Sequence, residues 1–297
     1  MGDDPRWPRA SSWLSGGAPS APADLTVLGV PASRTSISAT HAHLTPTAIR
    51  EALVRYSTYS WAHDVDVAGL TARDAGDILD PDEAEGEARV IHRVDELMPS
   101  TRLLIALGGD NSITHSVAVG VWGGEIAGAG LITLDAHHDL RDGMSNGSPV
   151  RRLVDAGLAG TRVVQVGIAD FSNSREYAAR ARDLGFTVVT RDALRHRPVA
   201  DVMAEALSVA GGGGGPIHVD LDVDVCDRSV VPACPAAAPG GLSADELRQA
   251  AFHAARSPLV RSVDVTEIDA AADAPDGRTV RLGALLVLEA ACGLALR

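Results

Sequence analysis

The stretch Leu131–Arg151, LITLDAHHDLRDGMSNGSPVR, places acidic residues and histidines directly after a short apolar run. The four apolar residues that open it predict a buried strand of a parallel sheet. Asp135, His137 and Asp139 follow at every second position, so an extended backbone would direct all three side chains to one side. Carboxylates with an added imidazole suit Mn²⁺ better than zinc. The stretch predicts a metal site at the end of a strand, although His137 and His138 could instead merely cap it.

Length and composition favour one large domain. The chain has 297 residues, 45% of them hydrophobic, which is enough for a sizeable core. Residues 1–22 are rich in Pro, Ser, Gly and Ala, so we expect a flexible N-terminal arm there, or an oligomer contact, and a single domain over residues 23–297. The sequence has neither an apolar run of about 20 residues nor a signal-peptide pattern at its start, so we expect a cytoplasmic protein without a membrane span.

The charge balance limits the possible partners. A formal net charge of -13 argues against nucleic-acid and anionic-membrane surfaces and fits a cationic small-molecule substrate such as an amidine. The sequence contains no lysine, which excludes a lysine Schiff base and a Walker-type phosphate loop. Its three cysteines are too few for a disulfide framework.

Apolar strand patterns alternate with helical patterns along the chain. Strands are expected within residues 25–31, 103–107, 131–134, 161–170, 186–192, 216–227 and 261–269. The acidic segment 72–98 reads as a loop followed by an amphipathic helix. Alternation of this kind predicts a mainly parallel sheet with helices on both faces, which is a three-layer α/β/α sandwich.

Polar residues stand where several of these apolar runs end. Asn111 follows one strand, Glu267 ends another, and Asp220, Asp222 and Asp224 alternate along a third. Three carboxylates on one face would repel one another unless a cation neutralised them, and the apolar neighbours argue against an acidic loop open to water. The carboxyl edge of an open parallel sheet is where ligands bind, so these residues should share one crevice.

Four segments resemble conserved motifs of the arginase, or ureohydrolase, family. They are GGDNSIT (108–114), DAHHD (135–139), DLDVDVCD (220–227) and VTEID (265–269), and the resemblance extends from about residue 25 to the end of the chain. It implies an arginase-like α/β/α fold, two Mn²⁺ ions per subunit at the carboxyl edge of the sheet, and a homo-oligomer, usually a trimer or hexamer.

The same motif matching implies roles for individual residues. Asp135 and Asp222 would bridge the two metals, His137 and Asp224 would complete one, and Asp139 would bind the other. Asn111 stands where the family usually has a histidine ligand. An amide oxygen is a weaker ligand, so we expect this metal to bind less tightly or without Asn111. His115 lies close by, but it should fall within the following helix and is not expected to replace the missing histidine.

The loop after the metal cluster bears on the substrate. SNGSPVR (145–151) has Asn146 where arginases and agmatinases carry histidine, and with VPACPAAAPGG (231–241) it resembles the formimidoylglutamases. These enzymes hydrolyse N-formimidoyl-L-glutamate to L-glutamate and formamide. The resemblance implies that Asn146 contacts the substrate. Glu267 would pair with the amidinium, and Asp139 would transfer a proton. Arg141 and Arg151 are candidates to bind the substrate carboxylates, or else are exposed solubility charges.

Two alternatives remain open on the sequence. The chain could be a guanidino hydrolase, similar to agmatinases or guanidinobutyrases, which would release urea. It could also be a metal-poor, non-catalytic relative, because Asn111 and Asn146 both depart from the wider family pattern.

Overall fold

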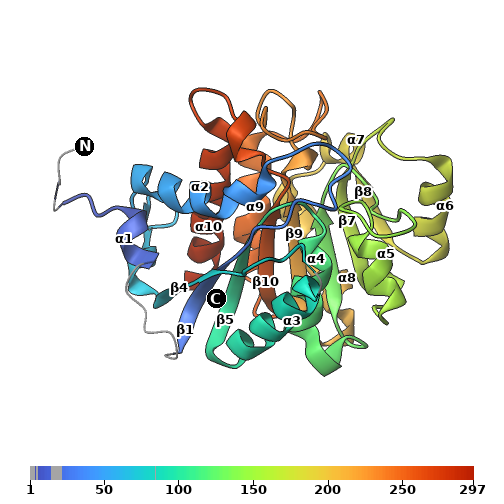
Figure 1. The fold of residues 1–297 in the computed structure, drawn as a ribbon, viewed down its shortest axis with the longest axis horizontal. Helices are drawn as coiled ribbons and strands as arrows, with labels where there is room; N and C mark the ends of the chain where they lie inside the picture. Colours follow the sequence, from blue (N-terminus) through green and yellow to red (C-terminus); the bar gives the residue numbers. More distant parts are fainter. Residues whose placement is uncertain (1–3, 5, 15–21, 84) are drawn as a thin grey trace.

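The computed structural model describes residues 4, 6–14, 22–83 and 85–297. Its main sheet has eight strands in the order β4-β1-β5-β10-β9-β6-β7-β8, and all neighbours pair in parallel (Figure 1). The strands are β1 (Ala23–Val30), β4 (Ala72–Asp77), β5 (Thr101–Gly108), β6 (Gly130–Leu134), β7 (Val163–Ile168), β8 (Thr187–Thr190), β9 (Ile217–Asp222) and β10 (Val260–Thr266). A small antiparallel pair, β2 (Tyr59–Ser60) and β3 (Val65–Asp66), lies apart from this sheet.

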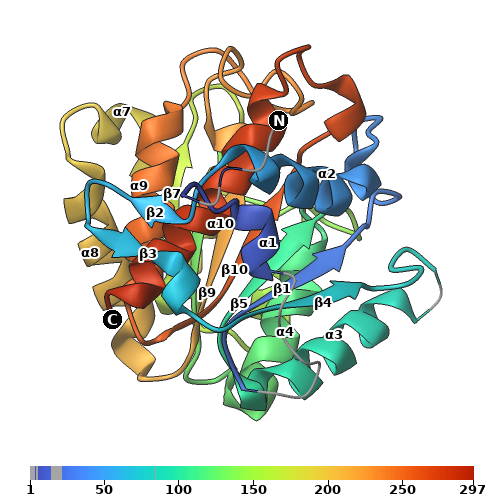
Figure 2. The same ribbon diagram turned by 90° about the vertical axis from the view of Figure 1, so that its left-hand side faces the viewer.

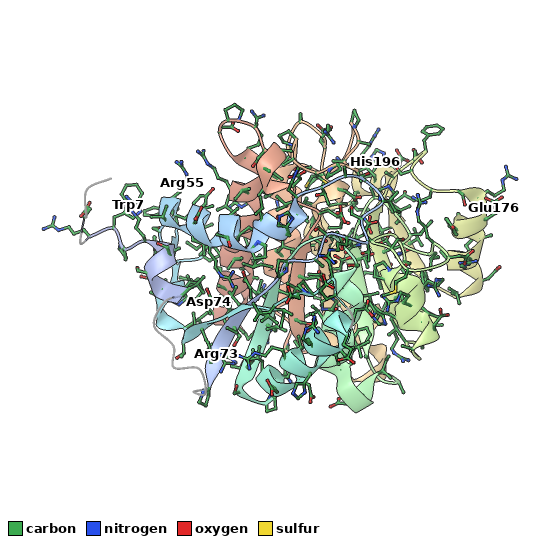
Figure 3. All side chains as sticks on the ribbon, in the orientation of Figure 1. Trp7, Arg55, Arg73, Asp74, Glu176 and His196 are labelled. Carbon is green, nitrogen blue, oxygen red and sulfur yellow. The ribbon has the colours of Figure 1, made fainter. Side chains whose placement is uncertain are left out.

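Helices cover both faces of the sheet, which confirms the predicted three-layer sandwich (Figure 2). One layer contains α2 (Thr45–Ala52), α7 (Arg191–Leu194), α8 (Val199–Ala210), α9 (Ala244–Ala255) and α10 (Arg278–Ala295). The other contains α3 (Gly86–Leu97), α4 (Ile113–Trp122), α5 (Pro149–Asp155) and α6 (Arg175–Asp183). Charged side chains such as Arg55 and Glu176 point outward from the molecule (Figure 3).

The central strands are buried on both faces, as their continuous apolar runs predict. Every residue of β6 and of β9 is buried. Strands β5, β10, β9 and β6 are consecutive neighbours, so the residues that follow them meet at one edge of the sheet, which lies uppermost in Figure 1. The four polar segments identified in the sequence are therefore brought together by strand order.

Two segments differ from the expectations. Residues 72–77 form the edge strand β4 and not a loop; four of its six residues are at least partly exposed, so it lacks an apolar run. Within the expected N-terminal arm, helix α1 (Ala10–Leu14) buries Ala10 and Leu14 in the main core cluster, so this part packs on the domain. The rest of the arm's structure can be stated only for residues 4, 6–9 and 22, because residues 1–3, 5 and 15–21 lie outside the described residues. Among the described helices, none has the length and apolar character needed to cross a membrane.

Candidate metal centre and pocket

A cavity of about 360 Å³ opens at the carboxyl edge of the sheet. Its lining residues come from the segments that follow β1, β6, β7, β9 and β10. Its walls include all but three of the predicted site residues, the exceptions being Asn111, Asp135 and Arg151. The lining residues include Ile37, Ser38, His137, Asp139, Arg141, Asn146, Asp222, Asp224 and Glu267.

Three of the predicted ligands form a compact group. Asp135, His137 and Asp224 each offer a ligand atom, and these atoms lie within 4.8 Å of one another. The Nδ1 atom of His137 is 2.8 Å from Asp224 Oδ2 and 3.4 Å from Asp135 Oδ1. Burial alone would lower the pKa of His137, but hydrogen bonds with Asp135 and Asp224 raise it to about 12. In this arrangement a proton on His137 balances part of the negative charge.

Asp222 and Asp224 are positioned by a turn. Asp222 ends β9 and caps the 3₁₀ turn Val223–Val225, its Oδ1 accepting from the N–H of Asp224 at 2.8 Å. Asp224 Oδ1 in turn accepts from the N–H of Ala136, 3.0 Å away. The prediction that all three aspartates lie on one face of an extended strand is therefore wrong. Asp220 stays inside the sheet with no exposed surface, next to Asp264 in register, and does not line the cavity.

Asp139 reaches the site through a left-handed backbone conformation, with φ of 51°, and not through strand alternation. Its Oδ2 accepts a hydrogen bond of 2.6 Å from the amide nitrogen of Asn111. The amide oxygen of Asn111 accepts from the hydroxyls of Thr114 (2.8 Å) and Thr266 (3.2 Å). Asn111 thus donates to Asp139, and its amide oxygen is bound to the two threonine hydroxyls. In this arrangement the Asn111 oxygen is not directed at a metal site, contrary to its expected role as a metal ligand.

The buried carboxylates fit divalent metal ions. Asp135, Asp139, Asp222 and Asp224 are at most 7% exposed. Burial and the neighbouring carboxylates raise the pKa of Asp135 to about 6 and raise the pKa of Asp139 and of Asp222 well above the usual range. Asp135 Oδ2 is buried without a hydrogen-bond partner in the described structure. Hard divalent cations would relieve this repulsion and occupy the free oxygen.

Glu267 lines the same cavity and directly follows β10. It has a left-handed backbone, with φ of 66°, and is only 3% exposed. Its Oε1 accepts from the N–H of Asn111 (2.7 Å) and from Nδ2 of Asn146 (2.9 Å). Burial raises the pKa of Glu267 to about 7, with Asp110 and Asp224 adding to the rise and both hydrogen bonds opposing it.

Glycine at position 109 lets the chain pass close to the site. A Cβ atom there would lie 1.8 Å from the carbonyl oxygen of Ala32, so only glycine fits. The backbone N–H of Glu267 donates to the Gly109 carbonyl at 3.0 Å. Glycine at this position therefore allows the close approach of the two backbones.

The two candidate arginines have different surroundings. Arg141 lines the cavity, and no ion pair or hydrogen bond of its guanidinium occurs among the described residues. The Arg151 guanidinium donates to the carbonyls of Arg141 (2.8 Å) and Gly143 (2.6 Å) and pairs with Asp155. Arg151 therefore holds the loop together, and the geometry does not support its expected contact with a substrate carboxylate.

Gln165 on β7, which the sequence patterns did not single out, contacts the residue next to the predicted ligand His137. Its Oε1 is 2.6 Å from Nδ1 of His138, and its Nε2 donates to the His138 carbonyl at 3.0 Å. His138 is buried and lies between two predicted site residues, His137 and Asp139. The glutamine in the apolar run VVQVGI could have indicated this contact, because a buried amide requires hydrogen-bond partners.

Replacing Gln165 by leucine should weaken divalent-metal binding about tenfold, since outer partners of metal sites commonly contribute factors of this size. The change removes both contacts with His138 while keeping the side-chain volume similar. Titration of the metal-free protein with Mn²⁺ measures the effect. The control is Gln249→Leu, which alters an exposed glutamine on α9. Equal affinities for the two variants would contradict a supporting role for Gln165.

Comparisons with known proteins agree with this architecture. The family model "Arginase family" matches residues 23–293. The chain is 36% identical to a formimidoylglutamase of Halalkalibacterium halodurans over 83% of this chain and 80% of the relative. It is also 36% identical to a formimidoylglutamase of Bacillus subtilis, over 91% and 87% respectively. The crystal structure of formimidoylglutamase from B. subtilis superposes with a TM-score of 0.93 at 32% identity, covering 100% of this chain and 94% of that one. The chain therefore belongs to the arginase family.

Proposed function

We propose that this protein hydrolyses N-formimidoyl-L-glutamate to L-glutamate and formamide, using two Mn²⁺ ions. The observation that carries the proposal is the buried carboxylate cluster that shares one cavity with Glu267, in a chain that is 36% identical to two formimidoylglutamases. The reaction breaks a C–N bond of a linear amidine, which needs an activated water and an anionic partner for the amidinium.

The metal ions would be held by the five acidic and histidine residues of the cluster. Asp135 and Asp222 would bridge them, His137 and Asp224 would complete one, and Asp139 would bind the other. When bound, such ions lower the pKa of water and so supply a hydroxide nucleophile near neutral pH. Asn111 donates to Asp139 at 2.6 Å. We therefore assign it to orienting that carboxylate rather than to binding a metal.

The remaining steps belong to side chains of the pocket. Glu267 uses one oxygen for Asn111 and Asn146, which leaves Oε2 for a charge-assisted pair with the amidinium. Asp139, which lines the same cavity, would take a proton from the attacking water and pass it to the leaving amine. Arg141, which lines the same cavity, would bind a substrate carboxylate.

The test is a product assay with the Mn²⁺-loaded protein. Formimidoylglutamate, agmatine, arginine and guanidinobutyrate are supplied separately, and formamide and urea are measured. We expect formamide from formimidoylglutamate, with kcat/KM at least about 100-fold above that for each guanidino compound. Agmatine and arginine carry a cationic amine that Arg141 would repel, and guanidinobutyrate has one carboxylate where formimidoylglutamate has two. Release of urea at the higher rate would instead favour the guanidino hydrolase alternative.

The non-catalytic alternative predicts a different metal content. Purified protein dialysed against Mn²⁺ should retain two ions per chain under our proposal, whereas a metal-poor relative should retain fewer and release neither product. The expectations of a homo-oligomer and of a cytoplasmic location remain predictions.

A further inference from the structure

Both polar atoms of the Asn146 side chain have protein partners. Its Nδ2 donates to Glu267 Oε1 at 2.9 Å and lies 3.5 Å from the hydroxyl of Ser36. Its Oδ1 accepts from the backbone N–H of Ile37 at 3.0 Å. These contacts tie the amide to Glu267 and to residues 36–37, although Asn146 also lines the cavity.

These contacts constrain Glu267. Its Oε1 receives two donors, one from the loop after β5 (the Asn111 N–H) and one from the loop after β6 (the Asn146 amide). The carboxylate is buried and stands on a left-handed residue, so its position depends on the groups that hold it. With Oε1 fixed in this way, Oε2 is the oxygen that can face a ligand in the cavity.

The same residue also fixes one wall of the cavity. Besides the Oδ1 contact with Ile37, the backbone N–H of Asn146 donates to the carbonyl of Thr35 at 3.2 Å. Ile37 and Ser38, which follow, line the cavity. Residues 35–38 come from the loop after β1, so Asn146 joins that wall to Glu267 through one side chain.

We propose that Asn146 is a positioning residue: it holds Glu267 with Oε2 directed at the amidinium and sets the distance between Glu267 and the wall formed by Ile37 and Ser38. This inference rests on the proposed function, in which Glu267 pairs with an amidinium. It replaces the expected direct contact between Asn146 and the substrate. Because Asn146 acts through Glu267 and this wall, its replacement should lower activity without removing a direct contact with the substrate.

Two substitutions of Asn146 separate the possibilities. Asn146→Ala should lower kcat/KM for formimidoylglutamate about tenfold or more, because the carboxylate loses one of its two donors. Asn146→Asp keeps the shape but places a second carboxylate 2.9 Å from Glu267, so it should be worse than alanine. A direct contact with the cationic substrate predicts the opposite order, since a carboxylate would bind it at least as well as an alanine does.

A second measurement tests the contact without any turnover. In the metal-free protein, unfolding by urea is compared for Asn146→Ala, Glu267→Ala and the double variant. We expect the two changes to be non-additive by at least about threefold in the unfolding equilibrium constant, as for residues in direct contact. As the control, Gln249→Ala with Glu267→Ala should be additive, because the Gln249 amide donates instead to Asp245 on the exposed side of α9.

The outcomes distinguish this inference from the proposed function. If Asn146→Asp is at least as active as Asn146→Ala and the stability effects are additive, the positioning role is overturned while formamide release still stands. If the unaltered protein releases formamide from no substrate, the proposed function fails, and the unfolding experiment alone decides whether Asn146 holds Glu267.

Discussion

Replacement of Asp222 by alanine should abolish metal binding and turnover together. Asp222 ends β9 inside the cavity, and the proposal makes it a ligand shared by both ions. Its loss should lower kcat/KM by about 1,000-fold or more, since metal ions stabilise the transition states of such reactions by several kcal/mol. Mn²⁺ at 1,000 times its dissociation constant should stabilise the unaltered protein by about 4 kcal/mol, and this stabilisation should disappear in the variant. Metal content, thermal unfolding and product release measure the three effects.

The matched control is Asp220→Asn, two residues earlier on the same strand. Asp220 is completely buried but does not line the cavity, so this variant should keep its metal ions and most of its activity. Full activity of Asp222→Ala, or equal loss of metal in both variants, would contradict the assignment of Asp222 as a ligand.

The sequence predicted where the site would be, because that information is local. A buried strand has to be apolar, and a polar residue at its end stands at the carboxyl edge, as Asp135 and Glu267 do. Parallel pairing places these ends at one edge of the sheet, and the strand order then brings them side by side. The edge strand β4 was not predicted, because an edge strand needs no continuous apolar run and its sequence, ARDAGD, has none.

The geometry inside the site could not be predicted in the same way. Alternation assumes an extended backbone, but Asp139 is on a left-handed residue and Asp224 is in a 3₁₀ turn. The roles of Arg151 and Gln165 depend on partners in loops, which strand patterns do not place. Arg151 donates to the carbonyls of residues 141 and 143, and Gln165 contacts the ring of His138. Such pairings become visible only when the loops are placed in three dimensions.

Replacement of Glu267 by glutamine should lower kcat/KM for formimidoylglutamate about 100-fold, because the neutral amide cannot form an ion pair with the buried amidinium. Glutamine keeps the length of the side chain and can still accept the two hydrogen bonds at Oε1, so the fold and the metal content should be preserved. Loss of Mn²⁺ from this variant would indicate that Glu267 acts on the metal cluster and not on the substrate.

The pH dependence gives a separate test of the same residue. Burial, with Asp110 and Asp224 near by, raises the pKa of Glu267 to about 7, so the carboxylate is ionised above this pH and protonated below it. Only the ionised form pairs with the amidinium. In unaltered protein, kcat/KM should therefore fall about tenfold per pH unit below the pKa of Glu267 in the Mn²⁺-loaded enzyme, which the charge of the ions brings below the value for the metal-free site. Glu267→Gln should be less active but should show no such fall over the same pH range, provided that the Mn²⁺ content, measured at each pH, stays constant. An unchanged fall in the variant would assign the titration to another group, and Glu267 would then not be the partner of the amidinium.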